Sequence, residues 1–194
     1  MYVQARDFQC DFYGLIGLLQ RYSTSYWDVE RLFLQQLESP SFYSQGRDAL
    51  YLLWKYENRL RSSQGFPPIS VRDFGSTDSR VKFSIEHIAA QTVDEVESSK
   101  IELTSRNEEF TKTYLHCIGN LVSDTHAGNS RKGNDPFFRK AEVYEQAPMM
   151  SQLELGRFAK RGPDGNPIWD VEAIRSRAEV LLRFARDCWD PLSV

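Results

Sequence analysis

The sequence has few cysteines and no long apolar run. Its 194 residues include three cysteines, Cys10, Cys117 and Cys188, which lie far apart and in no paired pattern. This count excludes a disulfide framework and is typical of a protein in a reducing cytoplasm. No window approaches a membrane-spanning length of apolar residues, and the first residues lack the apolar core of a secretory signal. We therefore expect no membrane span and a cytoplasmic location.

The sequence also lacks an excess of positive charge. It contains 24 lysines and arginines against 27 aspartates and glutamates, for a net charge of −3. Affinity for a nucleic acid from charge alone should therefore be weak, and we expect a partner domain to hold any such substrate. The chain has no internal repeat and no low-complexity tract, whereas its hydrophobic fraction of 41% is typical of a globular protein.

Apolar residues at helical spacing predict that most of the chain is α-helical. Two stripes before residue 39 and a third over 46–63 predict three N-terminal helices, whose aromatic residues we interpret as core packing. Asp135, followed by Pro136, predicts the start of another helix. Asp170 predicts the N-cap of a last long helix that runs to about residue 187.

Two short strands are predicted among these helices. Residues 80–88 alternate between apolar and polar side chains, which predicts a half-buried strand. Residues 116–122 are a second strand candidate, in which Gly119 indicates a bulge or a close approach of another segment. Helix resumes near His126.

Three short motifs place titratable and amide side chains around these strands. They are Glu86-His87-Ile88-Ala89-Ala90-Gln91, Asn120-Leu121 and Asn129-Ser130-Arg131-Lys132-Gly133. Hydrolysis of a phosphodiester needs a base for water, a divalent cation on the phosphate and a group that fixes the geometry of the base. Imidazole is the usual base near neutral pH, and Mg²⁺ prefers carboxylate and amide oxygens. Glu86, His87 and Asn129 supply these groups.

The motifs resemble those of HNH nucleases. Glu86-His87 is similar to their opening Asp-His, and Asn129 lies nine positions after Asn120, as their final His or Asn lies after the central Asn. The wider pattern resembles the C-terminal HNH nuclease domain of GmrSD-type restriction endonucleases, including phosphorothioate-sensing SspE-like proteins. This second resemblance covers roughly residues 50–189 and depends also on Pro136-Phe137-Phe138-Arg139-Lys140 and on Ile174, Arg177 and Trp189 of the last helix.

The resemblance implies a helical domain around a ββα-metal element, which is also called the HNH or His-Me finger. The fold class is then α+β, mostly α. Residues 1–78 form a helical N-terminal part that packs on a nuclease core over 79–194. Ala90 stands where the family has proline, and Thr125 and Gly128 stand where zinc-bearing relatives have cysteines, so no structural zinc is implied.

By this resemblance His87 is the general base and Asn120 orients it, which makes these two the candidate catalytic residues. Glu86 and Asn129 are the candidate ligands of Mg²⁺ or Mn²⁺. Adjacent residues of a regular strand point to opposite faces, so Glu86 and His87 reach one metal only where the strand ends or bulges. We therefore predict an end or a bulge near Glu86.

Three further residues of the last motif region are candidates for contact with the substrate. Arg131 and Lys132 are the candidate contacts to phosphate and DNA, and His126 is a candidate contact to metal or phosphate. His116, which neighbours Cys117 in the second strand candidate, we interpret as structural.

The function that the resemblance implies is divalent-metal-dependent cleavage of DNA in a modification-dependent restriction or anti-phage defence protein. In such proteins an N-terminal domain hydrolyses nucleotide and senses the modification. Its Asp-Gly-Gln-Gln-Arg signature is absent here, so we expect the chain to be the C-terminal part of a longer protein. Two alternatives stay open. One is a non-catalytic module with a degenerate HNH fold that binds DNA or a partner, and the other is a ribonuclease or toxin.

Overall fold

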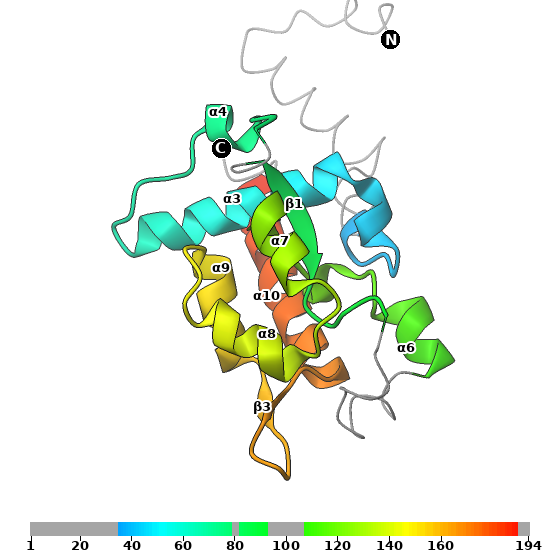
Figure 1. The fold of residues 1–194 in the computed structure, drawn as a ribbon. Helices are drawn as coiled ribbons and strands as arrows, with labels where there is room; N and C mark the ends of the chain where they lie inside the picture. Colours follow the sequence, from blue (N-terminus) through cyan, green and yellow to red (C-terminus); the bar gives the residue numbers. More distant parts are fainter. Residues whose placement is uncertain (1–34, 79–81, 93–106, 190–194) are drawn as a thin grey trace, which may run out of the picture.

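The structure is a computed structural model that describes residues 35–78, 82–92 and 107–189. These ranges form an α+β fold that is mostly helical, as predicted (Figure 1). The helices predicted before residue 35 lie outside the described residues. In the part of the chain that is described, no helix is both long enough and apolar enough to cross a membrane.

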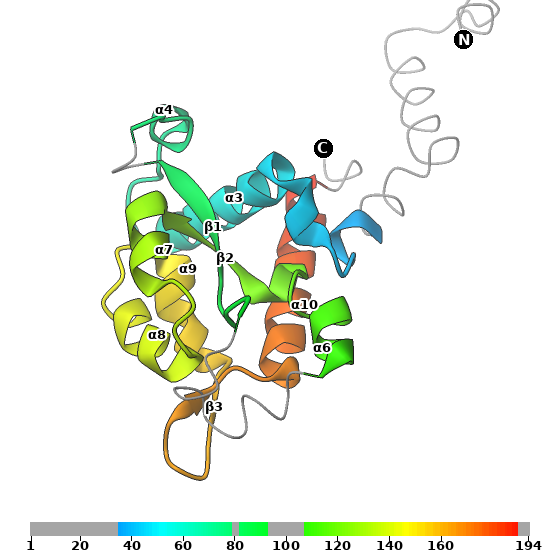
Figure 2. The same cartoon turned by 45° about the vertical axis from the view of Figure 1, so that its right-hand side comes forward.

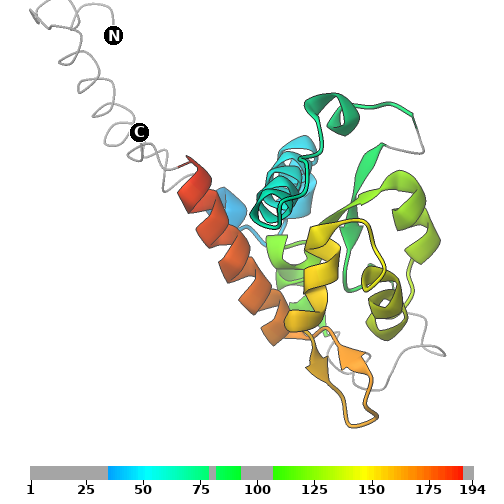
Figure 3. The same ribbon diagram turned by 90° about the vertical axis from the view of Figure 1, so that its left-hand side faces the viewer.

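One long helix, several short helices and two small sheets precede a final long helix. In chain order the elements are η2 (Phe42–Gln45), α3 (Arg47–Ser63), α4 (Val71–Phe74), β1 (Phe83–His87), α6 (Glu108–Thr113), η3 (Ile118–Asn120), β2 (Leu121–Thr125), α7 (His126–Lys132), α8 (Phe137–Tyr144), α9 (Met150–Leu153), η4 (Glu154–Arg157), β3 (Lys160–Arg161), β4 (Pro167–Ile168) and α10 (Val171–Trp189). Figure 3 shows α10 along one edge of the molecule and the β3–β4 hairpin projecting beside the N-terminal end of α10.

The strands β1 and β2 form an antiparallel pair in one-to-one register, from Phe83 opposite Thr125 to His87 opposite Leu121. The second strand begins at Leu121 and not at residue 116 as predicted, because residues 118–120 form the 3₁₀ turn η3. Strand β2 passes directly into α7, where the Thr125 hydroxyl accepts a hydrogen bond of 3.0 Å from the N–H of Gly128. The prediction of a helix near residue 126 is thereby confirmed.

The β1–β2 pair separates two clusters of buried apolar side chains. Leu121 and Val122 are neighbours in β2 and belong to different clusters, because successive side chains of a strand point to opposite faces. Figure 2 shows the pair between α7 and α8 on one side and α10 on the other. The cluster with Leu121 draws on η2, α3 and α10, and the cluster with Val122 draws on α6, α8 and the start of α10.

Helix α3 shares its core with the rest of the fold. Its residues Leu53 and Tyr56 lie in the same cluster as Leu121 and Leu181. The carboxylate of Glu57, which is fully buried, accepts hydrogen bonds from the backbone N–H groups of the first two residues of α9, at 3.0 and 2.8 Å. Helix α3 is thus fixed to both β2 and α9, while the division of the chain at residue 78 stays a prediction.

The predicted N-cap residue is correct for α10 and is off by one residue for α8. Asp170 caps α10 as predicted, since its carboxylate accepts a hydrogen bond of 2.8 Å from the N–H of Ala173. Helix α8 begins one residue later than its signal indicated, because Pro136 and not Asp135 is the N-cap residue. The fixed φ of proline suits either position.

Helix α10 packs directly on the backbone of η3. A Cβ atom added to Gly119 would lie 2.1 Å from the carbonyl oxygen of Ile174. One turn later the fully buried Arg177 donates from Nη1 to the carbonyl oxygens of Gly119, at 3.1 Å, and Leu121, at 2.6 Å. The predicted close approach at Gly119 is confirmed, and Arg177 holds η3 against α10.

Replacement of Gly119 by alanine should therefore destabilise the fold. We expect Gly119→Ala to lower the free energy of unfolding by about 1–3 kcal/mol, because the new methyl group meets backbone that cannot rotate away. Gly156→Ala is the matched control, since a Cβ there meets nothing within 4 Å, and should change stability by less than about 0.5 kcal/mol. Urea denaturation of both variants is the measurement, and equal stability of the two would contradict the packing described here.

Candidate active site

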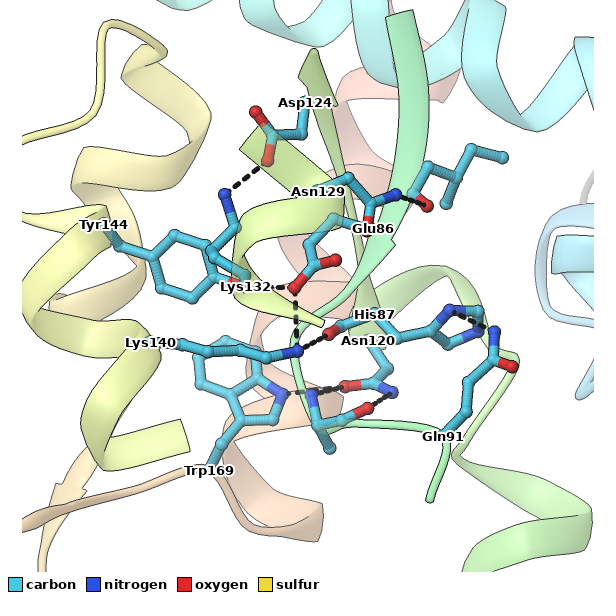
Figure 4. Close-up of polar contacts among 12 residues, drawn as sticks. Glu86, His87, Gln91, Asn120, Asp124, Asn129, Lys132, Lys140, Tyr144 and Trp169 are labelled. Atoms are coloured by element: carbon cyan, nitrogen blue, oxygen red, sulfur yellow. Dashed lines mark hydrogen bonds and ion pairs between the residues drawn. The ribbon is translucent and has the colours of Figure 1, made fainter. Parts of the chain in front are cut away.

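The side chain of Asn120 ties the end of β1 to two other segments. It is fully buried. Its Oδ1 accepts hydrogen bonds from the N–H of Ala89 at 2.8 Å and from Nε1 of Trp169 at 3.1 Å. Its Nδ2 donates to the carbonyl oxygens of Leu115 at 2.8 Å and Ala89 at 3.2 Å. Asn120 thus fixes the chain just after His87, and Figure 4 shows its side chain beside this segment.

Glu86 lies on the face of β1 that is covered by α8. Its Oε1 accepts a hydrogen bond of 2.8 Å from Nζ of Lys140 and one of 3.1 Å from the hydroxyl of Tyr144. The same Nζ donates to the backbone carbonyl of His87 at 2.9 Å. Burial raises the pKa of Glu86, and the charge of Lys140 opposes this shift. Burial likewise lowers the pKa of Lys140, and the charge of Glu86 opposes it.

His87 lies on the other face of β1, and both its ring nitrogens have partners. Its Nε2 is 3.0 Å from Nδ1 of His116, and its Nδ1 is 2.8 Å from Nε2 of Gln91. The ring of Tyr43 contacts it edge-on, with 4.5 Å between the ring centroids. Burial, then the neighbouring His116 and Lys140, lowers the pKa of His87 to about 3. The imidazole is therefore neutral at pH 7, which is the form that accepts a proton.

The structure places Glu86 and His87 on opposite faces of β1 (Figure 4). We predicted that β1 ends or bulges near Glu86, and the strand does end at His87. The register with β2 stays one-to-one through Glu86 and His87, so the β1–β2 pair has no bulge there. Directly opposite residues of an antiparallel pair share a face. Glu86 accordingly lies with Val122, and His87 with Leu121. The expected convergence of the two side chains on one ion does not occur in this arrangement.

Asn129 projects from α7 toward β1. Its Nδ2 donates to the carbonyl oxygen of Ile85 at 2.8 Å and to the hydroxyl of Ser84 at 3.1 Å. A carbonyl oxygen only accepts, so the amide nitrogen has to face Ile85. Both amide hydrogens are then in use, and Oδ1 is the atom of Asn129 that can bind a ligand.

The three remaining candidates of the last motif region lie in different surroundings. Arg131 is exposed, whereas Lys132 is buried and forms an ion pair with Asp124. In this arrangement Arg131 is the one of the two that can reach a phosphate. His126 is exposed, with its Nδ1 3.2 Å from the hydroxyl of Ser130, so it lies on the outer side of α7.

The candidate ligands have the chemistry to bind a divalent cation, but one of them is occupied by another group. Within the described ranges, no group of three or more His, Cys, Asp and Glu side chains is placed to hold a metal ion. A carboxylate and an amide oxygen, as in Glu86 and Asn129, are nevertheless the ligands that Mg²⁺ prefers. The cation that contacts Glu86 here is the ammonium of Lys140. The donor types therefore fit a divalent ion, and Lys140 has to release Glu86 before an ion can take its place.

Several residues of this site were not predicted from the sequence. Tyr43 contacts His87 although we assigned only core packing to the first sixty residues, and His116 forms a hydrogen bond with His87 although we interpreted it as structural. Lys140 lies in the Pro-Phe-Phe-Arg-Lys tail of the motif, which is the one signal in the sequence that could have indicated it. Tyr43 and His116 contact His87 from 44 and 29 positions away in the chain, so no local pattern reveals them.

Comparison with known proteins gives the class of this domain. Residues 27–184 match the model of a family of restriction endonucleases, so the chain is a domain of that class of proteins. It belongs to the family described as GmrSD restriction endonucleases, C-terminal domain. The family resemblance expected from the sequence is thereby confirmed. No curated protein and no solved structure matches the chain.

The burial of a neutral His87 makes stability depend on pH. The unfolded imidazole binds a proton below its ordinary pKa of 6.5, whereas the folded one does so only near 3. The unfolded state therefore binds more protons between these values, and the free energy of unfolding should fall as the pH is lowered from about 6.5. We expect His87→Gln to show a shallower decrease than the wild type in urea denaturation between about pH 7 and pH 4. His126→Gln, at an exposed histidine, should keep the wild-type dependence of the free energy of unfolding on pH. If His87→Gln shows the same steep dependence as the wild type, His87 is not its cause.

Asn120 should be required for stability, because its removal leaves buried backbone groups without partners. We expect Asn120→Ala to lower the free energy of unfolding by at least about 3 kcal/mol. The control is Asn166→Ala, since Asn166 is exposed and its Nδ2 bonds only to the nearby carboxylate of Asp164 within the described contacts. That change should cost less than about 0.5 kcal/mol. A stable, fully folded Asn120→Ala variant would show that Asn120 does not hold the end of β1.

Proposed function

We propose that this domain cleaves DNA by metal-dependent hydrolysis of phosphodiester bonds and is of the HNH type. The observation that carries the proposal is the imidazole of His87 at the end of β1, which is held by hydrogen bonds at both nitrogens. The family supports the proposal, because the chain belongs to a family of restriction endonucleases. The order of elements around His87, an antiparallel pair followed directly by α7, supports a ββα-metal element.

In the proposed reaction His87 is the general base. It removes a proton from a water molecule, and the water oxygen forms a bond to phosphorus as the bond from phosphorus to the 3′ oxygen breaks. The leaving 3′ oxygen takes up a proton from solvent, so the products carry a 5′-phosphate and a 3′-hydroxyl group. Asn120 contributes by fixing the backbone just after His87, through its two hydrogen bonds with Ala89. Exposed Arg131 is the proposed contact to a neighbouring phosphate.

The proposed cofactor is Mg²⁺ or Mn²⁺. Glu86 and Asn129 would hold it, through the carboxylate and through Oδ1. A bound ion supplies positive charge that stabilises the leaving 3′ oxygen. What this chain contributes is a buried carboxylate, whose present partner Lys140 has to release it before an ion can bind.

We place this activity in a cytoplasmic, modification-dependent restriction or anti-phage defence system. The proposed partner is an N-terminal domain that hydrolyses nucleotide and senses the modification, in a GmrSD-type or SspE-type protein. The charge of the chain supports such a partner, because a net charge of −3 gives little electrostatic affinity for DNA. Lys132, Lys140 and Arg177 are moreover buried and cannot reach a phosphate in this arrangement.

A non-catalytic module that binds DNA or a partner is the second candidate. The observation that favours it is the ion pair between Glu86 and Lys140, which lies on the opposite face of β1 from His87. A protein that never binds a metal ion could keep this pair permanently. Cleavage assays distinguish the two functions directly.

Supercoiled plasmid incubated with the chain and Mn²⁺ should be converted to nicked or linear DNA. We expect His87→Ala to lower the rate by at least about 100-fold, because the base is lost. EDTA should abolish the reaction of the wild type. Asn166→Ala is the control, since Asn166 is exposed between β3 and β4 and has no assigned role, and should retain cleavage. Gel electrophoresis of the plasmid is the measurement.

Three outcomes of such assays would contradict the proposal. Equal rates for the wild type and His87→Ala would remove His87 from the mechanism. A chain that binds the plasmid in a gel-shift assay without cleaving it, with either ion, would favour the binding module. Cleavage of RNA in preference to DNA under the same conditions would indicate the ribonuclease or toxin alternative.

A further inference from the structure

We infer that His116 is a positioning residue that holds the candidate base His87 in one tautomer, with the proton on Nε2 and the lone pair on Nδ1. The inference rests on the proposed function for its catalytic meaning. Its evidence is the set of hydrogen bonds around the two rings, which join three segments of the chain.

The partners of His87 determine which ring nitrogen carries the proton. Nε2 of Gln91 lies 2.8 Å from Nδ1 of His87, and an amide nitrogen can only donate. Nδ1 of the neutral ring is therefore the acceptor, and the proton is on Nε2. Nε2 lies 3.0 Å from Nδ1 of His116, which accepts it. The hydrogen bond made by one nitrogen of a histidine sets the role of the other.

The backbone around His116 is fixed on both sides. The N–H of Tyr43 donates to the carbonyl oxygen of His116 at 3.0 Å. The carbonyl oxygen of Leu115, the preceding residue, accepts from Nδ2 of Asn120 at 2.8 Å. The ring of Tyr43 stacks on that of His116, with an interplanar angle of 22° and 5.6 Å between centroids. His116 is thus held in place by contacts other than its hydrogen bond to His87.

The ring of His87 is buried, and its Nδ1 points toward the more exposed of its two partners. Nδ1 of His87 points to Gln91, whose side chain is exposed, whereas Nε2 points to the partly buried His116. A water molecule that replaces the Gln91 amide would meet the lone pair of Nδ1. A base whose orientation is set by a third group through its other nitrogen is a recurring arrangement in enzymes.

The test is NMR spectroscopy of the whole chain with ¹⁵N-labelled histidine, near neutral pH. The chain has three histidines, so each ring is assigned with one His→Leu variant. We expect His87 of the wild type to be the Nε2–H tautomer, with a ¹⁵N–¹⁵N coupling across the hydrogen bond to Nδ1 of His116. His116→Leu removes the acceptor and should shift His87 toward a mixture of tautomers. His116→Asn, whose Oδ1 can accept in place of Nδ1, should restore the Nε2–H form.

Cleavage kinetics give the second readout. In plasmid cleavage with Mn²⁺, His116→Leu should lower kcat by about 100-fold with KM nearly unchanged, and His116→Asn should recover most of the loss. His126→Leu, whose ring lies outside the hydrogen bonds of His87, should keep the tautomer of His87. Asn166→Ala, at an exposed residue between β3 and β4, should keep the rate. Circular dichroism checks that each variant is folded.

The possible results distinguish failure of this inference from failure of the proposed function. An Nδ1–H tautomer in the wild type, or a tautomer that stays unchanged in folded His116→Leu, would overturn the inference. If His116→Leu does not fold, the wild-type tautomer and its coupling to His116 decide the question without it. A wild type that shows the expected tautomer and coupling but cleaves no DNA would support the positioning of His87 and overturn the proposed function instead.

Discussion

The hydrogen bonds of Asn120 are the constraint on which the site depends. A single buried amide uses both its oxygen and its nitrogen to join the chain after β1, the carbonyl of Leu115 and the indole of Trp169. Because these segments are far apart in the sequence, the amide sets where β1 ends relative to the turn that carries His116. His87 lies at that end. An unpaired polar group costs more in a buried position than at the surface, so this network specifies one arrangement of the backbone.

The alternation of side chains along β1 then divides the polar residues into two groups. Glu86 faces α8 and pairs with Lys140, while His87 faces the opposite side and pairs with His116 and Gln91. The first group holds a buried carboxylate that is paired with an ammonium group. The second holds a buried imidazole whose two ring nitrogens both have partners. The proposed function requires the two groups to act on one phosphate from the two sides of the end of β1.

Local signals in the sequence predicted most of the elements and placed the motif residues on them. Asp170 caps α10 as predicted, and the chain resumes helix after β2 as predicted. Gly119 indicated the close approach of another segment, because only glycine leaves room for the carbonyl of Ile174. The second strand was placed five residues too early, since apolar residues in a 3₁₀ turn and in a strand look alike over so short a run. The sequence also identified the family correctly from the spacing of its motifs.

The sequence by itself therefore determined the mostly helical α+β class, because caps and periodicity act over short stretches of chain, and its motifs resemble those of the family to which it belongs. Only the tertiary structure decided the partners of the motif residues. Lys140 reaches Glu86 across 54 positions and His116 reaches His87 across 29. Such contacts depend on how α8, η3 and the strand pair pack together, and that packing results from the burial of both faces of β2 at once.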